Sequence, residues 1–466
     1  MLNKKPCSRF ILSCAAMSAA LAWGQAPPAQ SGGTQGGTQG GTPPPKVTTP
    51  DVKIPGPLTL IGPSQAEIGA QPLSITEAVN IALRKQPLVN IAKANIISAQ
   101  GRVEQAASGL YPQFTANAAY QNQASIRNSG PVLDPFTASV TVSQLLFDFG
   151  RTRDQVRQQN ALERSIRWDL TRTQQTTALQ VKSAFYNLVQ DLANVTISED
   201  DVANRQHELD EANARMNNGL GAPVDVLQAK TNLASGAVSL SAARDTALNA
   251  QVLLAQLLGI NPRTPIVPAS AKEVPLDMES DIEKLMTAAM TDRPDIKSAK
   301  EQVTAASFAV SQARKGDLPR VDAVGGVNGK GPNDPFATQA AAYGLVVSWT
   351  FGNGGLTAGQ VKEAIGNEDA ARQTLIQVSN QAIADVGQAF VDLQSALQRL
   401  DLAQVGVANA QELVRVDEGR YEGGIGQFLD VTTAQSSLFT AKLSLTQAQG
   451  DVERARAKLR TAIGLL

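Results

Sequence analysis

The sequence predicts a mainly α-helical protein with a small β part, in which one unit of about 200 residues occurs twice. Three observations support this fold class: an internal duplication, long stretches without glycine or proline, and two pairs of alternating segments typical of β-hairpins. The 466 residues are 42% hydrophobic and 18% charged, so the chain is neither strongly disordered nor strongly charged.

The duplication is clearest at the two ends of each unit. The segment from Arg215 to Gly259 aligns without a gap on Arg420 to Gly464, a displacement of 205 positions. The start of each unit aligns at a displacement of 207, which places Pro87 on Pro294. Because this period is too long for a solenoid repeat, it indicates two copies of one large supersecondary unit.

Each unit is predicted to contain a very long helix. Between Gly150 and Gly219 there is no glycine or proline, and a helix over this stretch would be about 100 Å long at 1.5 Å per residue. The matching stretch of the second unit runs from about Gly355 to Gly419 and contains a few glycines, so local bending is expected there.

An apolar residue recurs every seven positions along both long helices. The two stripes are Val181, Leu188, Val195, Val202, Leu209 and Met216, and then Val386, Leu393, Leu400, Val407, Val414 and Tyr421. A sustained heptad predicts coiled-coil packing on a neighbour. That neighbour is the next helix, about Pro223 to Leu258 in the first unit and Leu429 to Ile463 in the second. An ordinary helical hairpin of a cytosolic bundle is the alternative.

Each unit also contains a pair of alternating segments that predicts a β-hairpin. These segments are Gln113 to Gln123, Pro135 to Phe147, Arg320 to Gly329 and Ala341 to Phe351. A soluble hairpin would give a similar pattern. One unit therefore has a helix of about 35 residues, a β-hairpin, a helix of about 65, a tight turn and another helix of about 35. Four strands cannot close a membrane barrel, since about eight is the minimum, whereas three chains would supply 12.

The N-terminal region is predicted to be an export signal followed by a flexible leader. Residues 1–24 combine Lys4, Lys5 and Arg9 with an apolar stretch over Phe10 to Ala22, which is too short for a transmembrane helix. Residues 25–72 are rich in Pro, Gly, Thr and Gln and are predicted to lack a packed core. The first unit then covers 73–270 and the second 271–466.

The composition argues against most enzyme chemistry. His207 is the only histidine and is interpreted as a helix-surface residue, while Cys7 and Cys14 both lie within the predicted signal. Histidine-based zinc sites, serine triads and cysteine nucleophiles are therefore not expected in the mature chain, and we predict no enzyme activity, cofactor or metal site. A formal net charge of -1 without a basic tract argues against nucleic acid as a partner.

Three motifs make the chain similar to the TolC family of outer-membrane efflux proteins. They are the duplicated turn, Gly219-Leu-Gly-Ala-Pro-Val-Asp-Val and Gly424-Ile-Gly-Gln-Phe-Leu-Asp-Val, the segment Arg293-Pro294-Asp295-Ile296, and the strand-to-helix segment from Ser143 to Arg151. The resemblance covers about Leu73 to Leu466. It implies a homotrimer with a shared 12-stranded β-barrel in outer-membrane lipid and an α-helical barrel that forms a periplasmic tunnel. It also implies a periplasmic adaptor and an inner-membrane pump as partners.

The resemblance further implies roles for the turns between the two arms of each helical hairpin. In such proteins these hairpin tips contact the adaptor and form the periplasmic aperture. The corresponding positions are Gly219, Gly221, Pro223, Asp225 and Val226 in the first unit and Gly424, Gly426, Asp430 and Val431 in the second. Asp430 matches an aspartate that lines the pore constriction, and Thr433 stands where several relatives have a second one. For Asp225 and Asp430 the alternative is a helix-capping aspartate.

Two functions follow from these observations. The first is a passive outer-membrane conduit of a tripartite export system, which carries small molecules or proteins. The second is a periplasmic coiled-coil protein with a structural or adhesive role and no pore. The strand pairs and the duplication favour the conduit, because a scaffold needs neither.

Overall fold

The computed structural model describes residues 72–121, 136–269, 281–331 and 334–465, together with Ile54 and Gly56. The predicted signal over 1–24 lies outside these ranges, as does the predicted leader over 25–72 apart from Ile54, Gly56 and Pro72. The predicted boundary between the two units, at 270–271, also lies outside them.

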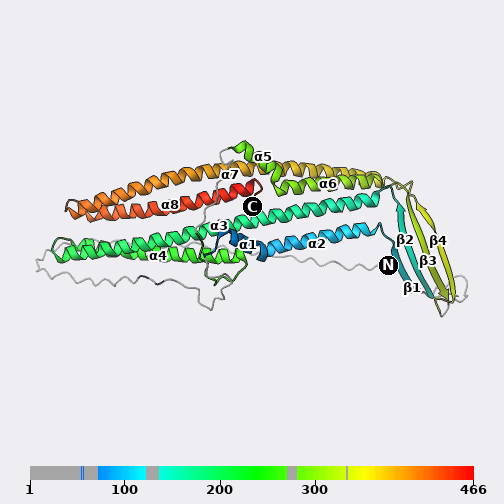
Figure 1. The fold of residues 1–466 in the computed structure, drawn as a ribbon, viewed down its shortest axis with the longest axis horizontal. Coiled ribbons are helices and arrows are strands. Elements are labelled where there is room, and N and C mark those ends of the chain that lie inside the picture. Colours follow the sequence, from blue (N-terminus) through cyan, green and yellow to red (C-terminus); the bar gives the residue numbers. More distant parts are fainter. Residues whose placement is uncertain are drawn as a thin grey trace, which may run out of the picture. The chain divides into compact units, whose positions relative to one another are not determined.

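The helices and strands follow one another in the same order in both repeats (Figure 1). The first repeat contains α1 Ile75–Lys85, α2 Pro87–Ser108, β1 Gln113–Tyr120, β2 Phe136–Phe147, α3 Arg151–Asn217 and α4 Pro223–Leu258. The second contains α5 Ile282–Asp292, α6 Pro294–Arg314, β3 Arg320–Gly331, β4 Thr338–Ser348, α7 Leu356–Glu422 and α8 Phe428–Ala462. The mainly helical class with a small sheet, predicted from the sequence, is therefore confirmed.

The predicted first helix of about 35 residues is wrong in both repeats, because the structure has two helices there. The break falls at Gln86 before Pro87 and at Arg293 before Pro294. Both residues are extended, with φ and ψ of −65° and 124° for Gln86 and −60° and 127° for Arg293. A proline ring clashes with a preceding residue in helical conformation, so the first helix ends there and a second begins.

The two long helices match the prediction closely. Helices α3 and α7 each contain 67 residues, and each begins after a glycine in the left-handed region, at φ 80° for Gly150 and 89° for Gly355. The internal glycines of α7 do not interrupt it. Helix α3 packs along α4 and α7 along α8, and heptad residues such as Val181, Leu188 and Leu393 are fully buried in these contacts.

The four strands form one antiparallel sheet in the order β1-β2-β3-β4. Strand β2 of the first repeat pairs with β3 of the second, and a bulge near Leu145 interrupts their register. Strand β4 ends at Ser348, so Trp349 and Phe351, which were predicted within it, follow the strand. Among the described residues β1 and β4 are the edges of the sheet and have no outer partner.

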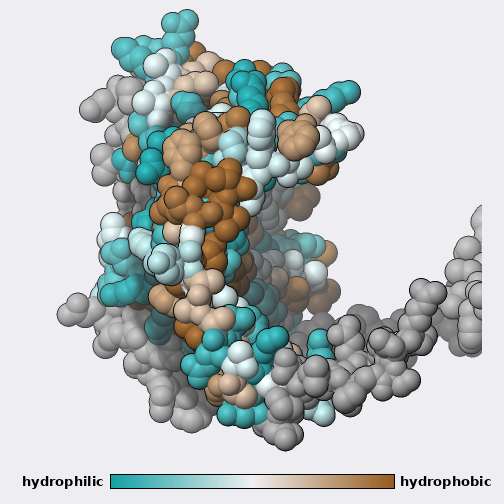
Figure 2. Space-filling model, turned by 90° about the vertical axis from the view of Figure 1, so that its right-hand side faces the viewer, coloured by the Kyte–Doolittle hydropathy of each residue, from teal (hydrophilic) through white to brown (hydrophobic). Residues whose placement is uncertain are grey.

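Large apolar side chains are exposed on this sheet. Figure 2, which faces the strand end, shows a patch of apolar residues there. Exposed members of β1, β2 and β4 include Phe114, Tyr120, Val140, Tyr343, Leu345 and Val347. None of the helices in the described ranges is both long and apolar enough to cross a membrane.

Candidate functional site

The tips of the two helical hairpins have the same backbone structure. At the first tip Gly219 has φ 72°, and the amides of Leu220 and Gly221 both donate to the Arg215 carbonyl, at 2.9 and 3.1 Å. At the second tip, Gly424 has φ 76°, and the following two amides donate to the Arg420 carbonyl at 3.0 and 2.9 Å. Glycine suits this left-handed position because it has no Cβ, and the 6→1 hydrogen bond closes the helix end.

Gly221 and Gly426 are required for a different reason, because the turn folds back onto the last helical turn. A Cβ at Gly221 would lie 3.0 Å from the Met216 amide nitrogen, and one at Gly426 would lie 2.9 Å from that of Tyr421. The two glycines of each tip therefore fix a tight turn, and the residue between them points outward. Leu220 is 80% exposed and Ile425 is 77% exposed.

Asp225 and Asp430 both lie in the first turn of a helix and partly out of solvent. Each carboxylate accepts a hydrogen bond, at 3.4 Å, from the amide that precedes the helix: that of Ala222 for Asp225 and that of Gln427 for Asp430. A carboxylate at this position accepts a hydrogen bond from an otherwise unpaired amide, and its negative charge interacts favourably with the helix dipole. The capping interpretation therefore fits both aspartates, and it leaves a second role for Asp430 open.

The remaining predicted tip residues divide into exposed and buried ones. Pro223 is exposed at the first position of α4, where its missing N–H costs nothing. Val226 and Val431 are 7% and 4% exposed, so they lie inside the hairpin ends rather than on their surface. The structure brings the glycines and aspartates of each tip together and separates the two valines from solvent.

Contacts between the two tips were not predicted from the sequence. The guanidinium carbon of Arg215 lies 4.1 Å from the centre of the Tyr421 ring, and Arg215 Nη1 donates to the Tyr421 carbonyl at 3.3 Å. Arg215 Nε lies 3.0 Å from Glu211 Oε1, and this ion pair orients the guanidinium. Phe428 of the second hairpin packs into an apolar cluster of the first hairpin. No pattern in the sequence predicts this contact, because Arg215 and Tyr421 belong to different hairpins.

A buried carboxylate lies further along the same hairpins. Glu208 is 7% exposed, and among the described residues its Oε1 has no hydrogen-bond partner. Burial, with the nearby carboxylates Asp201, Glu418 and Glu211, raises the pKa of Glu208 to about 7, although Arg205 acts in the opposite direction. Sequence patterns gave no warning of this, because a polar residue on a long helix is usually solvated.

Long helical hairpins with tight tips, joined at their other end to a sheet with apolar exposed faces, define a class of export channel. The chain belongs to the outer membrane efflux protein family, whose model matches residues 78–260 and 285–465. It is an efflux protein of the outer membrane, and the predicted resemblance, function and localisation are confirmed at this level. Its family and relatives are channels rather than enzymes.

Two curated relatives match most of the chain. The outer membrane efflux protein BepC of Brucella suis biovar 1 (strain 1330) is 25% identical over 405 residues, covering 84% of this chain and 85% of the relative. The outer membrane protein TolC of Escherichia coli (strain K12) is 25% identical over 422 residues, covering 86% and 83%. Among solved structures, the outer membrane protein VceC of Vibrio cholerae has a TM-score of 0.72 at 21% identity and covers 84% of this chain and 96% of its own.

Proposed function

We propose that three copies of this chain form one passive conduit for export. Their three sheets would close a shared 12-stranded barrel in the outer membrane, and their long helices would form a tunnel through the periplasm. The observation that carries this proposal is the four-stranded sheet, whose edges β1 and β4 have no outer partner among the described residues. Unpaired strand edges are very costly in lipid, so the edge of one chain must pair with that of the next.

The hairpin tips are proposed as the docking site for a periplasmic adaptor, which would connect the tunnel to an inner-membrane pump. Leu220 and Ile425 support this, because each is an apolar side chain held outward by a rigid turn. Changing both to aspartate should abolish export and leave the mass of the detergent-purified trimer unchanged. Val267→Asp, which alters an apolar residue that is 64% exposed outside the hairpin tips, is the control. Export that survives the double change would reject the tips as the docking site.

Asp430 is proposed to form a ring of three carboxylates around the aperture. Rings of acidic side chains favour cations and bind multivalent ones. The Thr433 hydroxyl, one turn further on, donates to the Leu429 carbonyl at 2.8 Å and adds no charge. A single ring should therefore bind a trivalent cation more weakly than a double ring would.

Single-channel conductance in planar bilayers tests the conduit and the ring together. Hexamminecobalt(III) on the periplasmic side should block the wild type, and Asp430→Asn should lose both the block and the preference for cations. Asp225→Asn is a matched control, because Asp225 makes the same first-turn hydrogen bond at the other tip. If Asp430→Asn is blocked as strongly as wild type, Asp430 is a helix cap only. A protein that is monomeric in detergent and forms no channel would support the scaffold function instead.

A further inference from the structure

One carboxylate in the middle of the first hairpin has no partner. Asp191 lies on α3 three positions after Leu188, at a heptad position where a packed apolar residue is expected. Its counterpart, 205 positions later, is Ala396, which is 1% exposed. Among the described residues Asp191 accepts no hydrogen bond and forms no ion pair. Burial raises the pKa of its carboxyl group above the ordinary value, and only the charge of Arg454 opposes this.

The guanidinium group of Arg454, on α8, is held by other acceptors. Its Nη1 donates to Asn187 Oδ1 at 2.7 Å and to Gln190 Oε1 at 2.9 Å, and its Nη2 donates to Asp451 at 2.6 Å. Arg454 therefore acts on Asp191 through its charge alone, and the carboxylate keeps its lone pairs for a ligand.

The second repeat has an ion pair where the first repeat has uncharged side chains. Arg399 Nη2 lies 3.6 Å from Asp451 Oδ2. The counterparts of these two residues in the first repeat are Asn194 and Thr246. The first repeat thus lacks this ion pair, while Asp191, in place of an alanine, adds a carboxylate without a cation.

Two adjacent cavities meet at Asp191. The larger, of about 310 Å³, lies between α3, α4 and α8, and the smaller, of about 270 Å³, lies between α3 and α4. Asp191 and Thr246 line both cavities. The large apolar side chains in the walls are Phe439 and Leu443 in the larger cavity and Leu253 in the smaller. A ligand in this place would therefore contact a negative charge and an apolar surface together.

The polar groups beside Asp191 are acceptors. The Thr246 hydroxyl donates its proton to the Ala242 carbonyl at 2.9 Å, so it offers a ligand only lone pairs. Asn194 lines the larger cavity, and its Oδ1 is buried without a hydrogen-bond partner among the described residues. A buried acceptor without a donor is costly, so the site favours a ligand that brings donors and positive charge.

We propose that the cavities beside Asp191 bind an organic cation, with its ammonium group on the Asp191 carboxylate and its apolar body along Phe439 and Leu443. An ammonium group offers only donors, which the acceptors here require. A small inorganic cation would leave the apolar walls uncovered, and a neutral apolar ligand would leave the carboxylate unpaired. One chain forms the whole site, so the proposal goes beyond the conduit and does not require the trimer.

Fluorescence titration of the detergent-purified protein tests the proposal. The probe is dansylcadaverine, a primary ammonium joined by an alkyl chain to a naphthalene ring. Wild type should bind it saturably. Asp191→Ala, which introduces the residue of the second repeat, and Asp191→Asn, which keeps the size, should both weaken binding about tenfold or more, because a charge-assisted hydrogen bond is lost. Since Asp191 has no partner, neither change leaves a group unpaired, and circular dichroism should show the helix content of wild type.

Two controls separate the site from general binding to charge or detergent. N-pentyl dansylamide has a similar body without the ammonium group and should bind wild type no more tightly than Asp191→Ala. Asp245→Ala removes an exposed carboxylate of α4 that lines neither cavity, and it should bind dansylcadaverine like wild type.

Three results would overturn the site: no saturable binding to wild type, wild-type affinity in both Asp191 variants, or an equal loss of affinity in Asp245→Ala. A protein that binds the probe at Asp191 but conducts no current in planar bilayers would contradict the proposed conduit and leave this site standing.

Discussion

The two repeats share the backbone of their tips but differ where the short helices meet the long ones. Both junctions contain an apolar cluster, but only the second adds a buried charge. Helix α1 packs on α3 and α4 around a buried cluster that includes Leu73, Phe185, Leu254 and Leu258. Residue Gln86, which precedes the proline, takes no part in this cluster. In the second repeat the residue before the proline is Arg293, which is 2% exposed and ionised.

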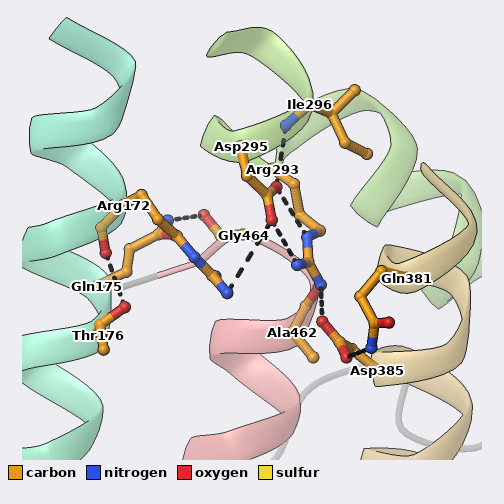
Figure 3. Close-up of polar contacts among 10 residues, drawn as sticks. All are labelled: Arg172, Gln175, Thr176, Arg293, Asp295, Ile296, Gln381, Asp385, Ala462 and Gly464. Atoms are coloured by element: carbon orange, nitrogen blue, oxygen red, sulfur yellow. Dashed lines mark hydrogen bonds and ion pairs between the residues drawn. The ribbon is translucent and has the colours of Figure 1, made fainter. Parts of the chain in front are cut away.

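The Arg293 side chain joins helices α6 and α7 to the C-terminal end of α8 (Figure 3). Its Nε and Nη2 donate to the two carboxylate oxygens of Asp295 at 3.0 and 2.6 Å, and Nη1 donates to Asp385 on α7 at 3.0 Å and to the Ala462 carbonyl of α8 at 3.2 Å. Burial alone would raise the pKa of Asp295, but the hydrogen bonds and charge of Arg293 outweigh it, so this pKa is lowered.

The difference follows from position in the fold. Helix α6 lies between α3 and α7 and contacts both, whereas α2 contacts α3 only among the long helices of the described residues. At the second junction, α3 adds Arg172 beside Asp295 and Gln175, whose amide donates to the Gly464 carbonyl at 2.5 Å. A buried guanidinium is tolerated where several acceptors converge on it, and the point where the repeats meet supplies them.

The largest expected effect on stability follows from removing the charge of Arg293. Arg293→Met keeps the bulk but removes the guanidinium donor of Asp295 and Asp385, whose side chains are 24% and 35% exposed. Removing one partner of a fully buried ion pair costs about 3–5 kcal/mol, and because water can reach these two carboxylates, the loss of stability should be at or below the lower end of that range. Gln86→Met at the equivalent position should change stability by less than about 1 kcal/mol. Thermal unfolding followed by circular dichroism in detergent measures both. If Arg293→Met and Gln86→Met lowered the stability of the protein equally, the two junctions would be energetically equivalent.

Sequence reasoning recovered the parts of the fold that repeat. The duplication, both long helices and the strand pairs follow from periodicity and from the absence of glycine and proline. The splits at Gln86 and Arg293 are missing from the prediction, because Pro87 and Pro294 serve there only to align the two units, although a proline also disfavours helical conformation in the residue before it.

Contacts between the repeats could not be predicted in this way. Arg293 belonged to a recognised motif, but its acceptors Asp385 and Ala462 lie 92 and 169 positions away and follow no period. Arg215 and Tyr421 are 206 positions apart, close to the displacement of 205 between the repeats, but the duplication only aligns Tyr421 with Met216 and predicts no contact between equivalent positions. Their proximity depends on how one hairpin packs on the other, and a pattern within one hairpin carries no information about it.

A smaller effect is expected from pH at Glu208, whose counterpart in the second repeat is Leu413. The pKa of Glu208 is about 7 in the folded chain against 4.5 ordinarily, so between these values the folded chain holds a proton that the unfolded chain has lost. The contribution of Glu208 to the free energy of unfolding is therefore largest below about pH 4.5 and is lost as the pH rises to about 7.

Glu208→Gln should remove this part of the pH dependence, because glutamine is neutral throughout and has nearly the same shape. The measurement is the unfolding midpoint of wild type and variant at pH 5 and pH 8. The unfolding midpoint of the variant, compared with that of wild type, should be more favourable at pH 8 than at pH 5. A constant difference between the two proteins at both pH values would show that Glu208 does not titrate in this range.

The smallest expected effect concerns the bridge between the tips, where the repeats again differ. Arg215 contacts Tyr421 of the other hairpin, whereas its counterpart Arg420 is 52% exposed and pairs with Asp417 on its own helix at 3.5 Å. A partly exposed cation–π contact contributes about 1 kcal/mol, which corresponds to about a fivefold change in an equilibrium. Arg215→Ala should therefore lower the free energy of unfolding by about 1 kcal/mol, and Arg420→Ala should change it by less; thermal unfolding in detergent measures both. Tyr421→Phe separates the ring from the hydroxyl: because Arg215 contacts the ring face and the backbone carbonyl, this variant should be as stable as wild type. A loss of stability in Tyr421→Phe as large as that in Arg215→Ala would assign the contact to the hydroxyl instead.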